Sequence, residues 1–277
     1  MVTKQDVIDA ARELGIQQGD IALIHSSFKS FGPVENGADT IVSGFLEALG
    51  PEGTLVFPTL CQADWAHVYE NWNLDAHSDV GYLTNYFRKL PGAKRSDQAT
   101  HSVAAIGKYA DYLTRTHGQS GLRHGIFGSS PFSADSPWEK MYEKNAKILF
   151  VGVGMIKCTF RHYTEYCFMD KHLRRAEGTA QYEELKHALW CYDRWDDQGV
   201  WPHISNNYIH TLMDSAGQVT YAQCGDARII CINAADFVDL TMRLLDEGHW
   251  ESLGGGAKGV SEWLEKIAEA EKSKKSK

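Results

Sequence analysis

The chain has 277 residues, of which 43% are hydrophobic, a length and composition suited to one large domain with a substantial core. Its formal charge is −8, and the last six residues contribute +4, so residues 1–271 carry about −12. A body this acidic disfavours nucleic acid or an anionic membrane as a partner and suits a cationic small molecule.

No sequence feature points to an exported or membrane-bound protein. The N-terminus is polar, and no run approaches the roughly 18 apolar residues of a membrane span. Six cysteines lie mostly in apolar segments and form no C-x-x-C pair, which is typical of reduced thiols. We therefore expect a cytoplasmic protein, with the basic end at 272–277 forming a disordered tail.

Helices and strands alternate through the first 60 residues. Apolar spacing and flanking Thr, Gly and Pro signals predict helix, strand, helix and strand at 3–14, 21–25, 38–49 and 54–58. This alternation is that of an α/β fold with a mostly parallel central sheet flanked by helices.

Further elements continue the pattern towards the C-terminus. Strands are predicted at 102–106, 148–153 and 228–232, and helices at 82–90, 137–144 and 235–247. The stretch 181–208 is rich in aromatic and charged residues without a clean period. We interpret it as part of an irregular cap, about 170–222, inserted in a single domain that spans 1–277.

The sequence H-Y-T-E-Y at 162–166 follows the apolar run 148–154. If a helix begins here, His162 and Glu165 share one face, because residues three apart are neighbours on a helix. The Glu165 carboxylate can then orient the imidazole, whose charge state is readily tuned near neutral pH. The pair is a candidate catalytic base, although the same spacing also occurs in an ordinary solvated helix start.

The loop 25–32 leaves the first strand and leads towards the next helix. Loops of this kind lie at the carboxyl edge of open parallel sheets, where ligands bind. Its backbone N–H groups and the Ser26 and Ser27 hydroxyls could hold carbonyl or phosphate oxygens, or only cap the next helix. The sequence contains no P-loop and no G-x-G-x-x-G after the first strand, which disfavours nucleotide binding of those types.

Six segments share a pattern with one known family. They are H-S-S-F-K-S-F-G-P-V-E-N-G-A-D-T at 25–40, G-P-E-G-T-L-V-F-P-T at 50–59, R-S-D-Q-A-T-H-S-V-A-A-I-G at 95–107, F-G-S-S-P-F-S-A-D-S-P-W-E-K-M-Y at 127–142, I-L-F-V-G-V-G at 148–154 with C-T-F-R-H-Y-T-E-Y at 158–166, and C-G-D-A-R-I-I-C-I at 224–232. In order and spacing they resemble the aminoglycoside 3-N-acetyltransferases, over about 20–170 and 220–245.

The resemblance implies an enzyme that moves an acetyl group from acetyl-CoA to a primary amine, without a metal and through a ternary complex. His162 and Glu165 match the family's catalytic pair, with His162 as the general base for the ammonium substrate. Asp64 stands where the family has an acidic residue that faces this amine, although a solvated loop carboxylate is an equal reading. The implied acceptor is an aminoglycoside or a similar polycationic small molecule.

The resemblance also implies where the cofactor binds. Eight residues match the family's cofactor groove, namely Ser26, Ser27, Phe28, Ser102, Val103, Ala104, Ser136 and Trp138. The first three would meet the pantetheine and the thioester, and their loop amides are candidate donors to the tetrahedral oxyanion. The last two would lie near the CoA end.

The stretch 170–222 departs from the family's pattern, as in W-C-Y-D-R-W at 190–195 and W-P-H-I at 201–204. Because this region should form part of the acceptor pocket, the acceptor could differ from an aminoglycoside. We expect a small-molecule amine as the partner, with no nucleic acid and no membrane, and we leave a homodimer open.

Two other functions fit parts of the sequence. A serine hydrolase could use Ser27, His162 and Asp64, although the G-x-S-x-G elbow is absent. A non-catalytic CoA- or polycation-binding protein would bind its ligand and release no thiol.

A zinc enzyme is a further alternative. Its ligands would be His25, His101, His162 and Glu165. The absence of H-E-x-x-H and of paired cysteines disfavours this reading.

Overall fold

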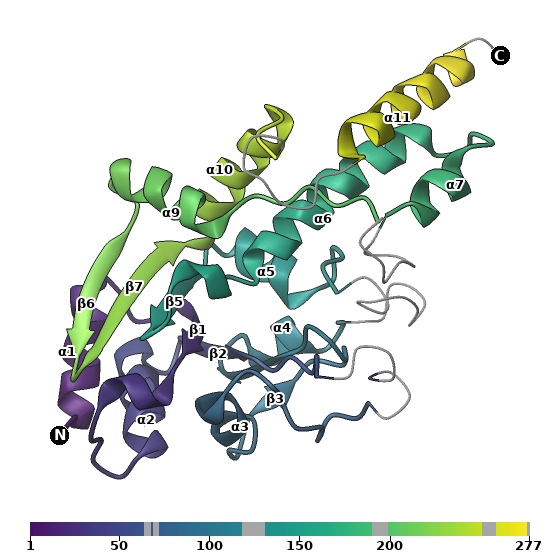
Figure 1. Cartoon of the computed structure of the whole chain (residues 1–277). Coiled ribbons are helices and arrows are strands. Elements are labelled where there is room, and N and C mark those ends of the chain that lie inside the picture. Colours follow the sequence, from purple (N-terminus) through teal and green to yellow (C-terminus); the bar gives the residue numbers. More distant parts are fainter. Residues whose placement is uncertain (64–67, 69–71, 118–130, 190–198, 251–258, 276–277) are drawn as a thin grey trace.

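The centre of the molecule is a seven-stranded sheet built from segments far apart in the chain (Figure 1). The computed structural model describes residues 1–63, 68, 72–117, 131–189, 199–250 and 259–275. Along the sheet the strands follow the order β3 (Lys94–Arg95), β4 (Val103–Gly107), β2 (Thr54–Pro58), β1 (Ile21–Ser26), β5 (Lys147–Val151), β7 (Ala227–Asn233) and β6 (Thr220–Cys224). The first strand of the chain therefore lies in the middle.

The predicted α/β class is confirmed. β1 pairs in parallel with β2 and with β5, so the expected parallel arrangement is correct for the three central strands. The other four pairings are antiparallel, because β4 and β7 run in the opposite direction. β6 and β7 are joined only by Gly225 and Asp226, and a connection this short permits only an antiparallel pair.

Two apolar clusters, one on each face of the sheet, form the core. Side chains alternate along β1, so Ala22 and Ile24 belong to one cluster and Ile21 and Leu23 to the other. The first face is covered by α1 (Lys4–Glu13), α2 (Ala38–Leu49) and α3 (Tyr82–Phe87). The second face is covered by α4 (Ala110–Thr114), α5 (Pro137–Glu143), α6 (Phe160–Leu173) and α10 (Ala234–Asp246).

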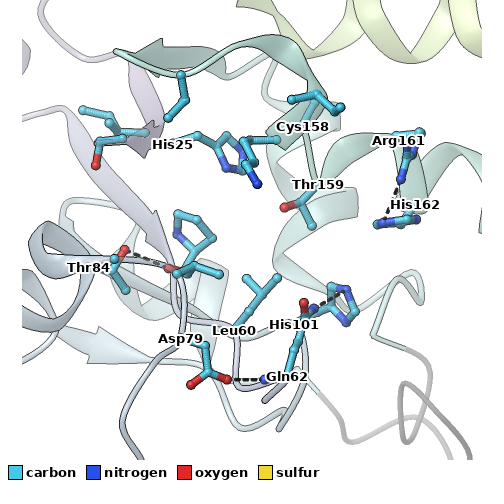
Figure 2. Close-up of a pocket in the computed structure, with 18 residues that line it drawn as sticks. His25, Leu60, Gln62, Asp79, Thr84, His101, Cys158, Thr159, Arg161 and His162 are labelled. Atoms are coloured by element: carbon cyan, nitrogen blue, oxygen red, sulfur yellow. Dashed lines mark hydrogen bonds between the residues drawn. The ribbon is translucent and has the colours of Figure 1, made fainter. Parts of the chain in front are cut away.

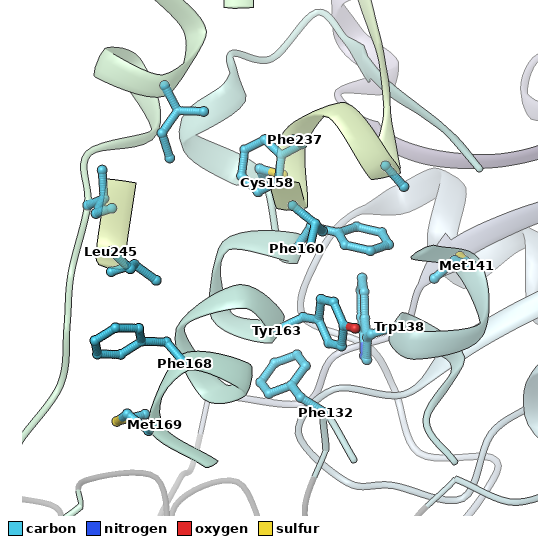
Figure 3. Close-up of a cluster of buried hydrophobic side chains, with 14 of the residues drawn as sticks. Phe132, Trp138, Met141, Cys158, Phe160, Tyr163, Phe168, Met169, Phe237 and Leu245 are labelled. Atoms are coloured by element: carbon cyan, nitrogen blue, oxygen red, sulfur yellow. The ribbon is translucent and has the colours of Figure 1, made fainter. Parts of the chain in front are cut away.

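Aromatic packing fixes α6 on the second face. Phe160 and Tyr163 project from α6 into a cluster that contains Trp138 and Phe132 (Figure 3). Phe160 meets Trp138 edge-on, with ring centroids 5.5 Å apart. Such aromatic pairs contribute about 0.5–1.5 kcal/mol beyond their buried area. Because one side of α6 is anchored in this way, the direction of its polar side is set as well.

The predicted elements agree with the structure to within three residues at either end. α1 begins with the expected cap: the Thr3 hydroxyl accepts a hydrogen bond from the Asp6 N–H, and the Asp6 carboxylate accepts one from the Thr3 N–H. The sequence did not predict β3, β6 or the helices α4, α11 (Val260–Lys275), α7 (Tyr182–His187) and α9 (Asn206–Ser215). The last two lie in the stretch expected to be irregular.

The prediction of a disordered tail at 272–277 is wrong for residues 272–275, which are helical. α11 (Val260–Lys275) buries Trp263 and Ile267, and Arg175 pairs with Glu271 at 2.8 Å. The buried apolar residues of α11 end at Ala270, and the basic segment continues the same helix, where Lys274 Nζ donates to the Arg175 carbonyl at 2.9 Å. Across the described ranges, every helix is too short or too polar to cross a bilayer. The short 3-10 helices are η1 (Phe28–Phe31), η2 (Met155–Lys157) and η3 (Arg174–Ala176).

Candidate active site

A cavity of about 460 Å³ opens at the edge of the sheet where the central strands end (Figure 2). Its wall includes Ser26 at the end of β1, Pro58 at the end of β2 and Val153 just after β5. β4 begins at the same edge because it runs antiparallel to β2, and this brings His101 into the wall. Carboxyl ends of parallel strands are the usual ligand-binding edge of α/β sheets.

The loop after β1 is held tightly against the end of β5. The Ser27 N–H donates to the Val151 carbonyl at 2.9 Å, and the Ser30 hydroxyl donates to the Ser27 carbonyl at 2.6 Å. Gly152 has φ +62°, and a Cβ there would overlap the Ser30 hydroxyl. Only glycine fits where the chain at position 152 approaches Ser30, which explains the first Gly of the V-G-V-G segment.

His162 and Glu165 form the pair that the sequence predicted. Both lie in the first turns of α6, with His162 Nδ1 2.9 Å from Glu165 Oε2. The His162 side chain is 27% exposed and lines the cavity, whereas the Glu165 side chain is completely buried. The imidazole therefore meets the cavity, and the carboxylate supports it from behind.

Glu165 is surrounded by donors from two parts of the chain. Trp201 Nε1 donates to Oε2 at 2.7 Å, while Arg161 Nε and His203 Nδ1 lie 3.4 Å and 3.5 Å from Oε1. Burial alone raises the pKa of Glu165, but the contacts with His162 and His203, together with the charges of His162 and Arg161, outweigh it and lower the pKa to about 2. Glu165 is therefore an ionised acceptor at neutral pH.

The neighbours of His162 determine its tautomer. A carboxylate can only accept a hydrogen bond, so Nδ1 carries the proton that points to Glu165. An arginine can only donate, and Arg161 Nη2 lies 3.4 Å from Nε2. Nε2 therefore carries the lone pair. A contact of 3.4 Å is weak, so a substrate amine can replace it.

Burial lowers the pKa of His162, and the hydrogen bond with Glu165 offsets part of this shift. The imidazole is thus neutral at neutral pH and able to accept a proton. Rings of His101, Phe132 and Trp201 surround it, with centroid distances of 6.1 Å, 6.4 Å and 6.0 Å. These rings restrict its rotation.

The wall of the cavity opposite α6 carries polar groups from the loops after β2. The Asp79 carboxylate accepts hydrogen bonds from the backbone N–H groups of Gln62 and Ala63, at 2.5 Å and 2.8 Å. Gln62 Nε2 lies 3.2 Å from His101 Nε2. Burial lowers the pKa of His101 well below its ordinary value, so this ring is neutral. Asp79 is the negatively charged member of this wall.

The structure brings only some of the predicted cofactor residues to the cavity. Ser26 lines it, whereas Ser27 and Phe28 lie in the adjoining turn and are not part of its wall. The Phe28 ring packs against Tyr82, with centroids 5.1 Å apart. Because the Ser27 N–H is already bonded to Val151, that amide is not the free oxyanion donor that the sequence suggested.

The remaining predicted cofactor residues are completely buried, namely Ser102, Val103, Ala104, Ser136 and Trp138. Ser102 donates to the Thr59 carbonyl at 2.9 Å, and Ser136 caps α5 by accepting from the Glu139 N–H. Trp138 Nε1 donates to the carbonyl of cavity-lining His101 at 3.1 Å. These residues shape the wall from within the core. Asp64 lies outside the described residues.

Several site residues were not predicted. Asp79 lies in no recognised motif, Arg161 lies in the 158–166 segment but was given no role, and Trp201 and His203 were noted only as departures from the family's pattern. Both of the latter reach Glu165 from the stretch expected to cap the acceptor. No local spacing signals a contact between such distant segments. Within the described residues, no group of three or more His, Cys, Asp or Glu side chains is arranged to hold a metal ion.

An α/β fold with a neutral imidazole held by a buried carboxylate at its ligand-binding edge defines an enzyme with a general base. The family described as "Aminoglycoside 3-N-acetyltransferase" matches residues 23–246. An aminoglycoside N(3)-acetyltransferase III from Salmonella sp is 29% identical over 255 residues, which cover 81% of this chain and 86% of that protein. The chain belongs to the aminoglycoside 3-N-acetyltransferase family and is an acyltransferase, as the resemblance implied.

Solved structures share the fold. AAC-IIIb in a binary complex with CoASH aligns with a TM-score of 0.68 and 19% identity, covering 88% of this chain and 96% of that one. AAC-VIa bound to sisomicin aligns with a TM-score of 0.66 and 21% identity, covering 88% and 97%.

Proposed function

We propose that the enzyme transfers the acetyl group of acetyl-CoA to a primary amine of an aminoglycoside or a similar polycationic small molecule. Family membership supports the acyl transfer, and the names of the relatives supply the class of acceptor. The observation that carries the proposal is that His162, whose lone pair is on Nε2, lines a cavity of about 460 Å³.

His162 performs the proton transfer in this reaction. An ammonium substrate must lose a proton before its nitrogen can attack, and Nε2 accepts that proton. The ionised Glu165 stabilises the resulting imidazolium. The nitrogen then bonds to the carbonyl carbon, and the C–S bond breaks when the resulting oxyanion collapses. His162 can return its first proton to the departing sulfur, and the second proton that the nitrogen loses passes through Nε2 to solvent. No change of oxidation state occurs, and the step balances with the chain's own acid–base groups.

The acyl donor lies along the edge formed by the ends of the central strands. Ser26 is the predicted cofactor residue that meets the cavity, and the turn containing Ser27 and Phe28 continues the surface outside it. We assign the buried Ser102–Ala104 segment a supporting role in this binding, since it forms the inner layer of the wall. The buried Trp138 contributes through its hydrogen bond to His101.

A carboxylate in the cavity wall can bind an ammonium group of a cationic acceptor, beside Lys157 and Arg161, which also line the wall. Asp79 lines the wall, and Asp64 is proposed to face the same amine from the preceding segment. Charge-assisted hydrogen bonds to ammonium groups are stronger than neutral ones. The net charge of about −12 over residues 1–271 acts in the same direction. The stretch 170–222 is proposed to contribute the rest of the acceptor surface.

The experiment is a panel of amines with acetyl-CoA, in which free CoA thiol is followed with DTNB in the presence of EDTA. We expect thiol release with aminoglycosides that contain 2-deoxystreptamine, together with an acceptor KM that rises with salt because exposed ion pairs are screened. Thermal stabilisation by acetyl-CoA should also survive EDTA. Preference for neutral or anionic amines without a salt effect would refute the polycation acceptor and leave acetyl transfer standing.

The alternatives give different results in the same experiment. A non-catalytic binding protein would be stabilised by CoA and release no thiol. A serine hydrolase would be labelled rapidly by a fluorophosphonate at Ser27. The structure favours neither, because Ser27 is not part of the cavity wall that contains His162.

A further inference from the structure

His25 is a second imidazole in the cavity wall. The residue is 6% exposed, yet Nε2 has no hydrogen-bond partner among the described residues. Buried polar atoms are nearly always paired, so an unpaired one in the wall of a cavity indicates a bond to a bound molecule. The other unpaired buried atoms in the wall and behind it, Arg161 Nε and Glu165 Oε1, lie 3.4 Å from each other.

The backbone and the neighbouring strand determine where this ring points. His25 has the same parity along β1 as Leu23, so its side chain lies on the sheet face that α6 covers. Its partner in the register of β5 is Phe150, and the two rings stack with centroids 5.3 Å apart and an interplanar angle of 7°. In Figure 2 the ring projects into the cavity beside Thr159. The stack holds it there.

The surroundings keep His25 uncharged. Burial lowers its pKa to about 3, and no carboxylate of the described residues bonds to the ring to offset this. The ring therefore has one N–H donor and one lone pair at any pH at which the enzyme works. It is a poor base, in contrast to His162. A neutral imidazole is instead a suitable donor to a carbonyl oxygen, because it polarises the bond without giving up its proton.

The reaction needs such a donor. Attack on the thioester places negative charge on the carbonyl oxygen, which preorganised donors must stabilise. The Ser27 N–H, one of the candidate donors in the loop, is already bonded to the Val151 carbonyl. His25 is the residue before Ser26 at the same strand end and lies in the same wall as His162.

We infer that His25 is a second catalytic residue, which donates its Nε2–H to the carbonyl oxygen of the acetyl thioester and to the oxyanion formed from it. This inference rests on the proposed acetyl transfer. The amine nitrogen forms the bond to the carbonyl carbon, the electron pair of the C=O bond moves to the oxygen, and it returns when the C–S bond breaks. His25 holds the charge during this step and neither gains nor loses a proton, while His162 carries the proton of the amine.

Three substitutions separate the donor from the shape of the ring. His25→Phe keeps the stack on Phe150 and removes the N–H, so kcat should fall about 10²- to 10³-fold, the usual effect of losing one oxyanion donor. His25→Gln places an amide nitrogen near the position of Nε2 and should recover at least about tenfold of this loss. His25→Asn is too short to do so. Thermal unfolding of each variant shows whether it is folded.

A spectroscopic measurement tests the contact without turnover. Infrared difference spectra of acetyl-CoA labelled with ¹³C at the carbonyl should show a lower stretching frequency when bound to the wild type and to His25→Gln, and no such shift with His25→Phe. The pH profile set by His162 should stay the same in all variants, and acetyl-CoA should still raise the unfolding temperature of each.

A folded His25→Phe variant with kcat within threefold of the wild type and an unchanged carbonyl frequency would overturn the inference. Equal losses in the Phe and Gln variants would overturn it as well, because shape rather than the donor would then matter. Failure of the wild type to release thiol with any amine would refute the proposed function, and the carbonyl frequency would still decide whether His25 contacts the thioester.

Discussion

Trp201 Nε1 and His162 Nδ1 both donate to the same oxygen of Glu165, at 2.7 Å and 2.9 Å. Glu165 is completely buried, so these bonds are what make an ionised carboxylate tolerable there. Trp201 comes from the segment between α7 and α9 rather than from α6. The orientation of the base therefore depends on how this separate segment docks.

Trp201→Phe removes this donor and keeps most of the buried ring. A hydrogen bond to a charged group contributes about 1.5–3 kcal/mol, so we expect kcat to fall roughly tenfold or more and the pKa of Glu165 to rise. Trp263→Phe is a matched control, because its indole N–H donates to the distant Leu185 carbonyl at 2.9 Å. Steady-state kinetics of both variants check this. Equal effects on kcat would mean that stability alone is responsible.

His162→Ala should lower kcat by about 10²- to 10⁴-fold, the usual scale for losing a positioned general base. Binding of acetyl-CoA should change little, because the side chain acts on the amine. Single-turnover kinetics and an acetyl-CoA titration check the two parts separately. Near-normal turnover by a folded variant would remove His162 from the mechanism.

Glu165→Gln tests the role of the carboxylate through pH. The base acts when neutral, so kcat/KM should rise with pH through the pKa of His162. Contact with Glu165 raises this pKa, which burial lowers. Removing the negative charge should therefore move the rising limb to lower pH and reduce kcat, by less than His162→Ala does. A rate profile on the wild-type limb would contradict an ionised Glu165.

Asp64→Asn tests the proposed acceptor contact. Loss of a carboxylate that holds an ammonium group in the ground state should raise the acceptor KM more than it lowers kcat. The effect should shrink at high salt, because screening weakens the wild-type interaction. Initial rates at low and high salt give the comparison. An unchanged KM would assign Asp64 to a solvated loop.

Buried neutral histidines should make the fold sensitive to acid. His117 accepts from the Ser96 hydroxyl and donates to the Pro131 carbonyl, both at 2.8 Å, and burial lowers its pKa to about 3 from an ordinary 6.5. As pH falls below 6.5, His117 binds a proton in the unfolded chain but stays neutral in the folded chain. The free energy of unfolding should then decrease by about 1.4 kcal/mol per pH unit for this group, until pH reaches about 3.

His117→Gln removes this titration. Its overall stability can be lower, but the slope of the free energy of unfolding between pH 6 and 4 should become shallower by about the same amount. Urea titrations at several pH values measure the slope. A wild-type slope in the variant would show that His117 does not titrate in this way.

Local patterns predicted those parts of the molecule that local forces determine. Helix spacing and strand alternation identified the bounds of α2 and β2, and the spacing of His162 and Glu165 placed both on one helical face. The direction of β4 and β7 depends on pairing between distant segments, which periodicity does not encode. Trp201 meets Glu165 for the same long-range reason.

The cofactor residues show a different gap. Ser102 and Trp138 lie in family motifs. A motif does not distinguish a side chain that touches the ligand from one that supports the cavity wall from the core. Only burial separates the two roles, and burial depends on how α5 and β4 pack. For the same reason His25 was considered as a metal ligand by residue type alone, whereas its stack on Phe150 defines a different environment.

The position of β1 in the middle of the sheet affects how the molecule can be assembled. Ser26 in β1 pairs with Val151 in β5, and Thr220 in β6 donates to the Leu14 carbonyl at 3.3 Å. Strands and loops near the N-terminus therefore find their partners in segments more than 100 residues later. Contacts between such distant residues form slowly because a long loop must first close. A nascent chain that stops before β5 leaves one edge of β1 unpaired and apolar, which favours association with other chains. We expect the catalytic cavity to be among the last features to form during synthesis.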